Sequence, residues 1–170
     1  MTLDELNHLG VHEASATLTR CCGSSRWVAR MVERRPFSGE TELVDEADRI
    51  WQSLSTDDWI DAFSHHPKIG ATGSGDKKFE RTRGWSSEEQ AGVQNAPESA
   101  LRALADANRE YEQKFGYIFI VCATGKNERE ISELLQRRLK NDARTEIAIA
   151  AEEQRKITRL RLEKLLKSPA

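Results

Sequence analysis

Two neighbouring histidines, His65 and His66, precede Pro67 at the start of a glycine-rich stretch between predicted helices. A proline disfavours helical backbone at the residue before it, so we expect His66 to be extended and its ring to be restrained. Imidazole titrates near neutral pH, which makes His66 a candidate proton donor or acceptor. The structural alternative is that His66 ends the preceding helix and hydrogen-bonds a nearby carbonyl group.

Metal and phosphate sites have less support in this stretch. Adjacent histidine side chains rarely bind one metal ion together, and the sequence has no C-x-x-C pair to supply further ligands. The glycines from Gly70 to Gly84 lack the G-K-[ST] ending of a phosphate-binding loop. Proton transfer is therefore the chemistry that the stretch indicates.

A second polar cluster follows at residues 86–90, with the sequence SSEEQ. Ser86 with Glu89, and Ser87 with Gln90, have the spacing of a capping box, so these side chains can be interpreted as the start of a helix. A functional interpretation uses the same geometry. The N–H groups of a helix N-terminus attract an anion, and a Glu beside a Gln can orient a urea-like or imide-like ligand.

The cysteines and the C-terminal arginines are weaker candidates for chemistry. Cys122 lies in an apolar run with no neighbouring base, so we expect a buried core residue. Cys21, Cys22 and Cys122 form an odd set, which predicts reduced thiols and a cytoplasmic protein. The basic residues of the last predicted helix are mostly expected on a solvated face, although one of them can turn inward to a carboxylate.

Composition narrows the class of protein. The 170 residues carry a formal net charge of −2 with a pI of about 6.1, which gives no reason to expect a nucleic-acid or membrane partner. No apolar run approaches the roughly 18–20 residues of a membrane-spanning helix. The first ten residues lack the pattern of a signal peptide, which again favours the cytoplasm.

The elements that position these residues are predicted to be helices. Apolar residues recur with helical spacing along almost the whole chain, so we expect an all-α fold. The prediction is a single compact domain, residues 1–170, of roughly seven to nine helices, with one long catalytic loop from Ser64 to about Trp85. A helical turn should begin at Ser86, and Tyr117–Ala123 should be a buried extended segment or the start of a helix. The last helix, from about Asp142 to Leu166, is expected to face inward through Ile147, Ala150, Ala151, Ile157, Leu160 and Leu165.

Five segments in chain order resemble the motifs of one family, the 2-oxo-4-hydroxy-4-carboxy-5-ureidoimidazoline (OHCU) decarboxylases, in their bacterial form. The resemblance covers nearly the whole chain. Its motifs are CCGSSRWVARMVERRPF from Cys21, His66-Pro67 with Ile69-Gly70, Ser86-x-x-Glu89-Gln90-Ala91-Gly92, Asn108-x-x-Tyr111-x-x-Lys114-Phe115-Gly116-Tyr117-x-Phe119-Ile120, and Lys156-Ile157-x-x-Leu160-Arg161-Leu162.

The resemblance implies an all-helical enzyme that decarboxylates OHCU to (S)-allantoin in urate degradation, with no metal or organic cofactor. His66 matches the catalytic histidine, and Glu89 is expected to assist it. The substrate-binding positions implied are Pro67, Ser86, Gln90, Phe119, Ile120, Val121, Cys122, Ala123 and Arg161. Arg161 would either neutralise substrate charge or brace Glu89. One departure is Thr124-Gly125-Lys126, where animal and plant members tend to carry an arginine and an asparagine.

Two other functions stay open from the sequence. The first is a ring hydrolase of a related ureide, in which His66 and Glu89 activate water. The second is a helical binding module without catalysis, although such a module need not keep His66, Glu89, Gln90 and Arg161 together. Relatives are often dimers, so the resemblance also allows a homodimer.

Overall fold

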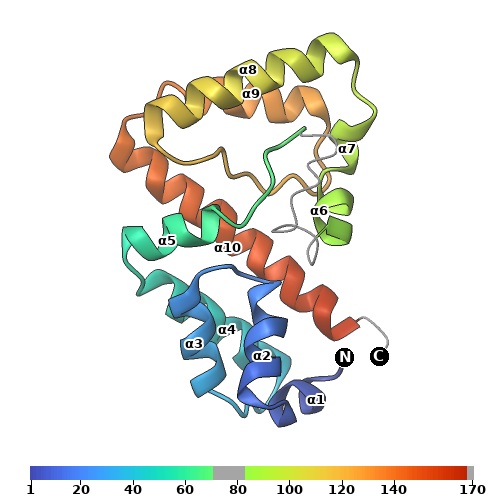
Figure 1. Ribbon diagram of the computed structural model, residues 1–170, viewed down its shortest axis with the longest axis vertical. Helices are drawn as coiled ribbons and strands as arrows, with labels where there is room; N and C mark the ends of the chain where they lie inside the picture. The colour runs from blue at the N-terminus through green and yellow to red at the C-terminus, as the bar shows by residue number, and fades with distance from the viewer. Residues whose placement is uncertain (71–82, 168–170) are drawn as a thin grey trace. The chain divides into compact units, whose positions relative to one another are not determined.

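Helices form all the regular structure in residues 1–70 and 83–167, the part of the chain that the computed structural model describes (Figure 1). No strand occurs in these ranges, so the all-α prediction is confirmed. The helices are α1 (Leu3–His8), α2 (Val11–Thr19), α3 (Ser25–Glu33), α4 (Glu40–Gln52), α5 (Thr56–Phe63), α6 (Arg83–Glu89), α7 (Ala91–Gln94), α8 (Glu98–Phe115), α9 (Glu128–Arg138) and α10 (Ala143–Lys167). None of the helices in the described ranges combines the length and apolarity needed to cross a bilayer.

The described ranges hold ten helices rather than seven to nine, because one predicted turn is two helices. The backbone leaves helical geometry at Gln90, with φ −100° and ψ 15°, which separates α6 from α7. The start of α6 at Arg83 also places Ser86 inside the helix instead of at its N-terminus. The predicted capping role of Ser86 is therefore wrong. Residues 71–82 of the predicted loop lie outside the described residues.

The chain divides into two compact units. The first contains residues 1–62 and 155–170, and the second contains residues 63–154. α10 contributes residues to both units. The interpretation of residues 1–170 as a single domain stays a prediction.

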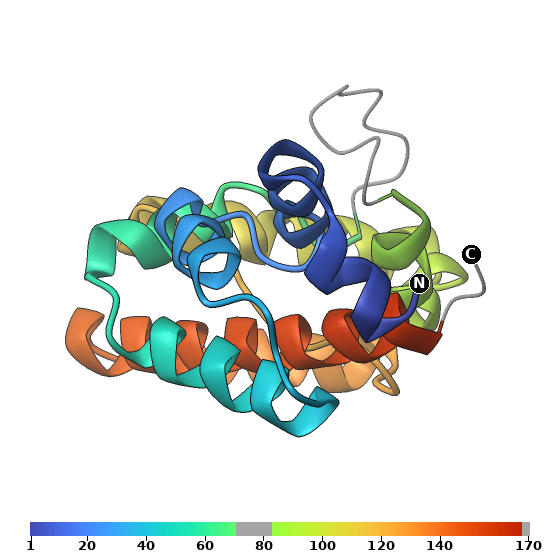
Figure 2. The same ribbon diagram turned by 90° about the horizontal axis from the view of Figure 1, so that it is seen from below.

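In the first unit, α3 packs against α2 and α4. The side chains of Leu18, Trp27 and Leu43 are fully buried there, and the Trp27 indole Nε1 donates to Ala47 O at 3.0 Å. Arg155 of α10 reaches Asp48 of α4, with Nη1 2.6 Å from Oδ2, and Figure 2 shows these two helices running alongside each other.

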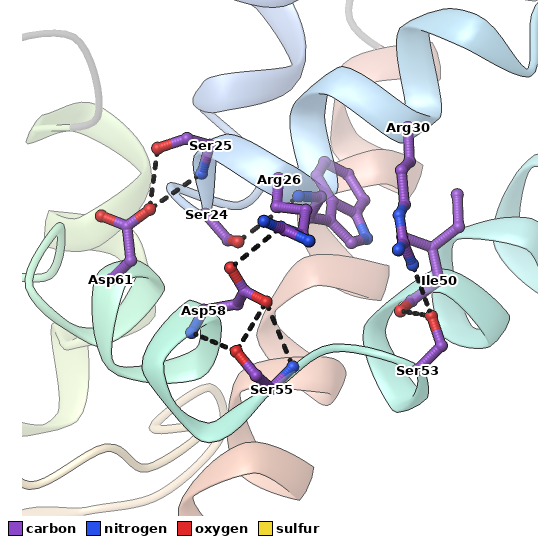
Figure 3. A network of polar contacts seen from close by, with 10 residues as sticks. Ser24, Ser25, Arg26, Arg30, Ile50, Ser53, Ser55, Asp58 and Asp61 are labelled. Atoms are coloured by element: carbon purple, nitrogen blue, oxygen red, sulfur yellow. Dashed lines mark hydrogen bonds and ion pairs between the residues drawn. The ribbon is translucent and has the colours of Figure 1, made fainter.

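A polar network joins the start of α3 to α5 in the first unit (Figure 3). Ser24 Oγ caps α3 by accepting from Trp27 N at 3.4 Å, and Asp61 accepts from both N and Oγ of Ser25 at 2.9 and 2.8 Å. At the start of α5, Asp58 accepts from Ser55 Oγ at 2.8 Å, which lowers the pKa of the Asp58 carboxyl. The network fixes α5, the helix that ends three residues before His66.

In the second unit, α8 lies side by side with α9 (Figure 1). Gly116, with φ +82°, ends α8 in the left-handed conformation that glycine adopts most readily. The chain then turns into residues 117–123, which belong to no helix or strand and are buried at every position except Ile118. The prediction of a buried extended segment is confirmed. Its aromatic rings pack with those of α8, since the ring centroid of Tyr111 lies 5.3 Å from that of Phe119 and 6.0 Å from that of Tyr117.

Candidate active site

His66 lies three residues after the end of α5 at Phe63, and Pro67 restricts its backbone. Its N–H donates to Phe63 O at 3.2 Å, and its ring Nε2 lies 2.7 Å from Gln154 Oε1 of α10. An amide oxygen only accepts hydrogen bonds, so Nε2 carries the hydrogen in this contact. The imidazole is therefore held at both ends, through its backbone and through its ring, while staying half-buried.

The segment after His66 is anchored through its main chain. Asn108 Nδ2 donates to Ile69 O at 3.1 Å, and Gly70 N donates to Gln90 Oε1 at 3.1 Å. Gly70 has φ +75°, and a Cβ at this position would come within 3.2 Å of Leu104 Cδ2, so glycine is strongly favoured. Gln90 thus has a structural contact that sequence reasoning did not predict, made through its side-chain oxygen.

Glu89 and Ser86 lie on α6, close to Gln90 in the chain. Ser86 is 6% exposed, and its carbonyl accepts from Gln90 N at 3.1 Å as the helix ends. Glu89 is the last residue of α6 and is half-buried. An anion site at the N-terminus of a helix beginning at Ser86 is therefore not present, and any role of Ser86 in binding depends on its position inside the helix.

The extended segment holds the five predicted pocket residues, and all of them are buried: Phe119, Ile120, Val121, Cys122 and Ala123. Glu153 Oε2 accepts from Cys122 N at 2.7 Å, while Lys126 Nζ donates to Cys122 O at 2.8 Å. Both main-chain groups of Cys122 are thus fixed by charged side chains. Lys126 belongs to the Thr124-Gly125-Lys126 departure noted in the sequence.

A buried ionic cluster fixes the same segment at Ile120. Arg138 Nη1 donates to Ile120 O at 2.6 Å, and Arg138 Nε donates to Glu146 Oε1 at 2.7 Å. Glu146 also accepts from the Tyr111 hydroxyl and, at 3.0 Å, from Asn141 Nδ2. Burial and the hydrogen bond to Glu146 raise the pKa of Tyr111, so the phenol keeps its proton and can donate.

The electrostatics around Cys122 show which charged groups share its neighbourhood. Burial raises the pKa of the Cys122 thiol, the carboxylate of Glu153 raises it further, and Lys126 opposes them. Glu89 also raises it, so this carboxylate acts on the same thiol. A protonated thiol is a poor nucleophile, which agrees with the predicted core role of Cys122.

Arg161 lies in the first unit, on the C-terminal half of α10. Its side chain is 3% exposed, and Nη1 donates to Arg20 O at 3.2 Å. It also lowers the pKa of the neighbouring Cys22 thiol, although burial is the larger effect and raises that pKa to about 12. Neither predicted role of Arg161 follows from these contacts, and both stay predictions.

Sequence reasoning missed the polar residues that hold the site: Lys126, Arg138, Glu146, Glu153 and Gln154. One signal could have found two of them. Glu146, Ala150, Gln154 and Thr158 recur at every fourth residue of α10 and are all buried. Ala150 was correctly predicted to face inward, so a ridge with i, i+4 spacing through it predicts the burial of Glu146 and Gln154.

Metal ligands do not gather in the part of the chain that the structure describes. No group of three His, Cys, Asp or Glu side chains there is arranged to hold a metal ion. His65 and His66 are included in that range.

The known proteins that resemble this chain agree with one another. Residues 7–163 match the family described as OHCU decarboxylase. The uric acid degradation bifunctional protein TTL of Arabidopsis thaliana is 37% identical over 150 residues, covering 88% of this chain and 46% of that protein. The chain therefore spans about half the length of that relative. The 2-oxo-4-hydroxy-4-carboxy-5-ureidoimidazoline decarboxylase of Amia calva is 28% identical and is covered over 97% of its length.

A solved structure agrees with these matches. The crystal structure of an OHCU decarboxylase in the presence of (S)-allantoin superposes with a TM-score of 0.75 at 38% sequence identity. The match covers 88% of this chain and 96% of that structure. With a family match over 7–163 and relatives at this identity, the chain belongs to the OHCU decarboxylase family.

Proposed function

We propose that this protein decarboxylates 2-oxo-4-hydroxy-4-carboxy-5-ureidoimidazoline to (S)-allantoin in urate degradation, without a cofactor. The observation that carries the proposal is the family match over residues 7–163, which includes every predicted site residue. Its support from geometry is the fixed imidazole of His66, which shares the second unit with Glu89, Gln90 and the buried segment 119–123.

The reaction breaks the bond between a ring carbon and its carboxylate. Carbon dioxide leaves, the electron pair stays on the substrate, and the carbonyl and imine groups of the ring delocalise it. A proton must then reach the carbon from one face to give a single enantiomer. The protein has to orient the carboxylate out of the ring plane, stabilise the enolate-like intermediate and supply that proton.

We assign the proton-transfer role to His66, because imidazole as a group exchanges protons near neutral pH. The ring of His66 is also held in one orientation by Gln154. Glu89 orients the N–H or hydroxyl groups of the substrate and stabilises protonated His66. Gln90 Oε1 accepts a hydrogen bond from Gly70 N. The amide N–H groups of Gln90 are therefore the part that binds a substrate carbonyl.

The remaining substrate contacts are assigned to Pro67, Ser86 and the main chain of residues 119–123. That main chain is suited to recognition because Arg138, Glu153 and Lys126 already fix its peptide orientations. Arg161 is proposed to neutralise substrate charge or to brace Glu89. We further propose a cytoplasmic protein, since its cysteines are free thiols, and a homodimer, as in relatives.

The experiment that tests the proposal follows circular dichroism while urate is converted by urate oxidase and hydroxyisourate hydrolase. Without a decarboxylase the product decays to racemic allantoin, which gives no net signal. Rapid growth of an (S)-allantoin signal with release of carbon dioxide is the expected result. Slow racemic decay would overturn the proposal, and ureide loss without carbon dioxide would favour the ring hydrolase.

The catalytic residue is tested in the same assay with His66→Ala. General acid–base groups typically contribute about 10²–10⁴-fold to the rate, so a loss of at least about 100-fold is expected. His12→Ala, the same substitution at an exposed position of α2, should keep the wild-type rate. A His66→Ala variant with near-normal turnover would remove His66 from the mechanism.

A further inference from the structure

Gln154 is a fully buried polar side chain in the second unit, with 0% of its surface exposed. Burying an amide without a hydrogen-bond partner is unfavourable, so buried amides are normally paired. Its Oε1 lies 2.7 Å from His66 Nε2, across 88 positions of sequence. A buried amide on the ridge of α10 thus contacts the ring of the histidine proposed for proton transfer.

We propose that Gln154 is a positioning residue for His66, which holds the imidazole in one orientation and keeps Nε2 protonated. The inference rests on the proposed function, because it assigns Gln154 a part in the same decarboxylation. The structural reason is that the amide oxygen can only accept, so the contact is compatible with the Nε2–H tautomer and with the imidazolium form.

The backbone cannot provide this control alone. The restriction from Pro67 and the hydrogen bond from His66 N to Phe63 O fix the main chain, but the ring can still rotate about its χ angles. Gln154 acts at the tip of the ring, where it limits that rotation. Because Gln154 lies inside the 25-residue helix α10, the hydrogen bonds of the helix fix its main chain.

Other charged groups of the second unit could also affect the pH profile that the test measures. Glu153 precedes Gln154 on α10 and bonds Cys122 N, and Lys126 bonds Cys122 O. Glu89 of α6 acts on the same cysteine, and His65 precedes His66 in the chain. All four are unchanged in the variants below, so a changed pH profile reports the acceptor at position 154.

The test compares Gln154→Met with Gln154→Glu. Methionine keeps the length of glutamine without its acceptor, so kcat should fall about 10- to 100-fold, as for other partners that orient a histidine, with KM nearly unchanged. The alkaline limb of the kcat/KM profile should move to lower pH, because protonated His66 loses an acceptor. Gln154→Glu keeps an acceptor and adds charge, so it should retain more activity and move that limb to higher pH.

Gln136→Met on the exposed side of α9 is the matched control and should leave both constants and the profile unchanged. If Gln154 had only a structural role, the two variants would reduce the amount of folded enzyme. The alkaline limb of the pH profile would not then move in opposite directions in Gln154→Met and Gln154→Glu. If both variants kept the wild-type profile and kcat, the positioning role would be wrong while the decarboxylase activity stood.

A second readout does not depend on activity. Nitrogen NMR of the His66 ring should show the Nε2–H tautomer in the wild type and a mixture in Gln154→Met. If the wild type failed to decarboxylate OHCU, the proposed function would fall, and the tautomer would still decide whether Gln154 holds His66. An unchanged tautomer in a folded Gln154→Met variant would overturn the inference.

Discussion

Arg138 Nε lies 2.7 Å from Glu146 Oε1 within the second unit, where the two side chains are only 7% and 0% exposed. The pair has a further role, because Arg138 Nη1 also donates to Ile120 O at 2.6 Å. A buried ion pair therefore sets the orientation of a peptide group in the segment that we propose lines the substrate pocket.

Removing one member of this pair should be strongly destabilising. Arg138→Met leaves Glu146 charged and buried without its cation, so we expect a loss of about 3–5 kcal/mol in the free energy of unfolding. Replacing both residues, in Arg138→Met with Glu146→Leu, should cost less than the sum of the single changes. Urea unfolding measures all three variants.

The control is Arg129→Met on α9, whose ion pair with Glu133 is exposed at 86% and 57% of the two side chains. It should change the free energy of unfolding by at most about 0.5 kcal/mol. Strictly additive costs for Arg138 and Glu146 would show that the two side chains are not coupled.

Gly92 is expected to tolerate no side chain, because a Cβ there would overlap Lys126 O and lie 3.1 Å from Asn127 Cα. Gly92→Ala should therefore destabilise the fold by about 1–3 kcal/mol, as overpacking usually does. It should also raise KM, since Lys126 holds Cys122 O. Thermal unfolding and steady-state kinetics check the two effects.

Gly84 of α6 provides the matched control, because a Cβ at that position meets nothing within 4 Å. Gly84→Ala should stabilise the helix by about 0.5–1 kcal/mol. Equal stability changes for Gly84→Ala and Gly92→Ala would contradict the close approach of α7 to the Lys126 main chain.

Glu89→Gln should separate catalysis from stability. Glu89 is the last residue of α6, where a carboxylate opposes the partial negative charge of the helix end, so its removal should not destabilise the protein. We expect most activity to be lost while the melting temperature stays the same or rises. Parallel loss of activity and stability would indicate a structural residue.

The rate at which the Cys122 thiol is alkylated should depend on the charged side chains beside it. Glu153 raises its pKa and Lys126 lowers it, so Glu153→Gln should speed alkylation of Cys122 near pH 8, and Lys126→Met should slow it. Mass spectrometry of the alkylated peptides gives the rates. Cys22, whose pKa is raised to about 12, is an internal reference that should stay unreactive. Rates that change in the same direction for both variants would contradict this arrangement.

Acid stability should depend in part on Glu46 of α4. Hydrogen bonds from Arg49, with further help from Arg34, hold the pKa of Glu46 at about 2, below its ordinary value of 4.5. A carboxyl whose pKa is lowered on folding stabilises the protein above the ordinary pKa and loses that effect as the pH falls toward 2. The difference in melting temperature between wild type and Glu46→Gln should therefore shrink from pH 5 to pH 2.

Glu40→Gln, at an exposed position of the same helix, is the comparison for this series. A difference for Glu46→Gln that stayed constant from pH 7 to pH 2 would show that the carboxylate is not titrated in this range.

Much of the helical fold could be predicted because its signals are local. Thr2 forms a capping box with Glu5, Asn127 forms one with Glu130, and Gly116 ends α8, so each signal lies within a few residues of the helix end that it determines. The extended segment after Gly116 was also predicted as buried, since a short apolar run without polar residues has few other places to lie.

The start of α6 could not be placed in the same way. Two serines with the spacing of a capping box look like a helix start, but α6 begins three residues before Ser86. In the folded chain the Ser86 carbonyl accepts a hydrogen bond from Gln90 N at the C-terminal end of the helix.

The residues that support the candidate site from the helices were not predicted from the sequence, because they are polar and their partners are distant in sequence. A glutamine, a glutamate and an arginine on amphipathic helices are normally assigned to the solvent side. Gln154, Glu146 and Arg138 are buried because each has a specific partner, and only the tertiary structure reveals those partners. Ile147 and Leu160, which were also predicted to face inward, are only half-buried.

The placement of Glu153 and Gln154 as consecutive residues of α10 makes both of their contacts depend on the register of that helix. Successive helical residues point about 100° apart, so one contacts Cys122 N while the other contacts His66. Inserting or deleting a single residue between Glu146 and Glu153 would rotate both side chains away from their partners at once. Related sequences should therefore conserve the seven-residue spacing from Glu146 to Glu153 without gaps, even where the residues between them differ.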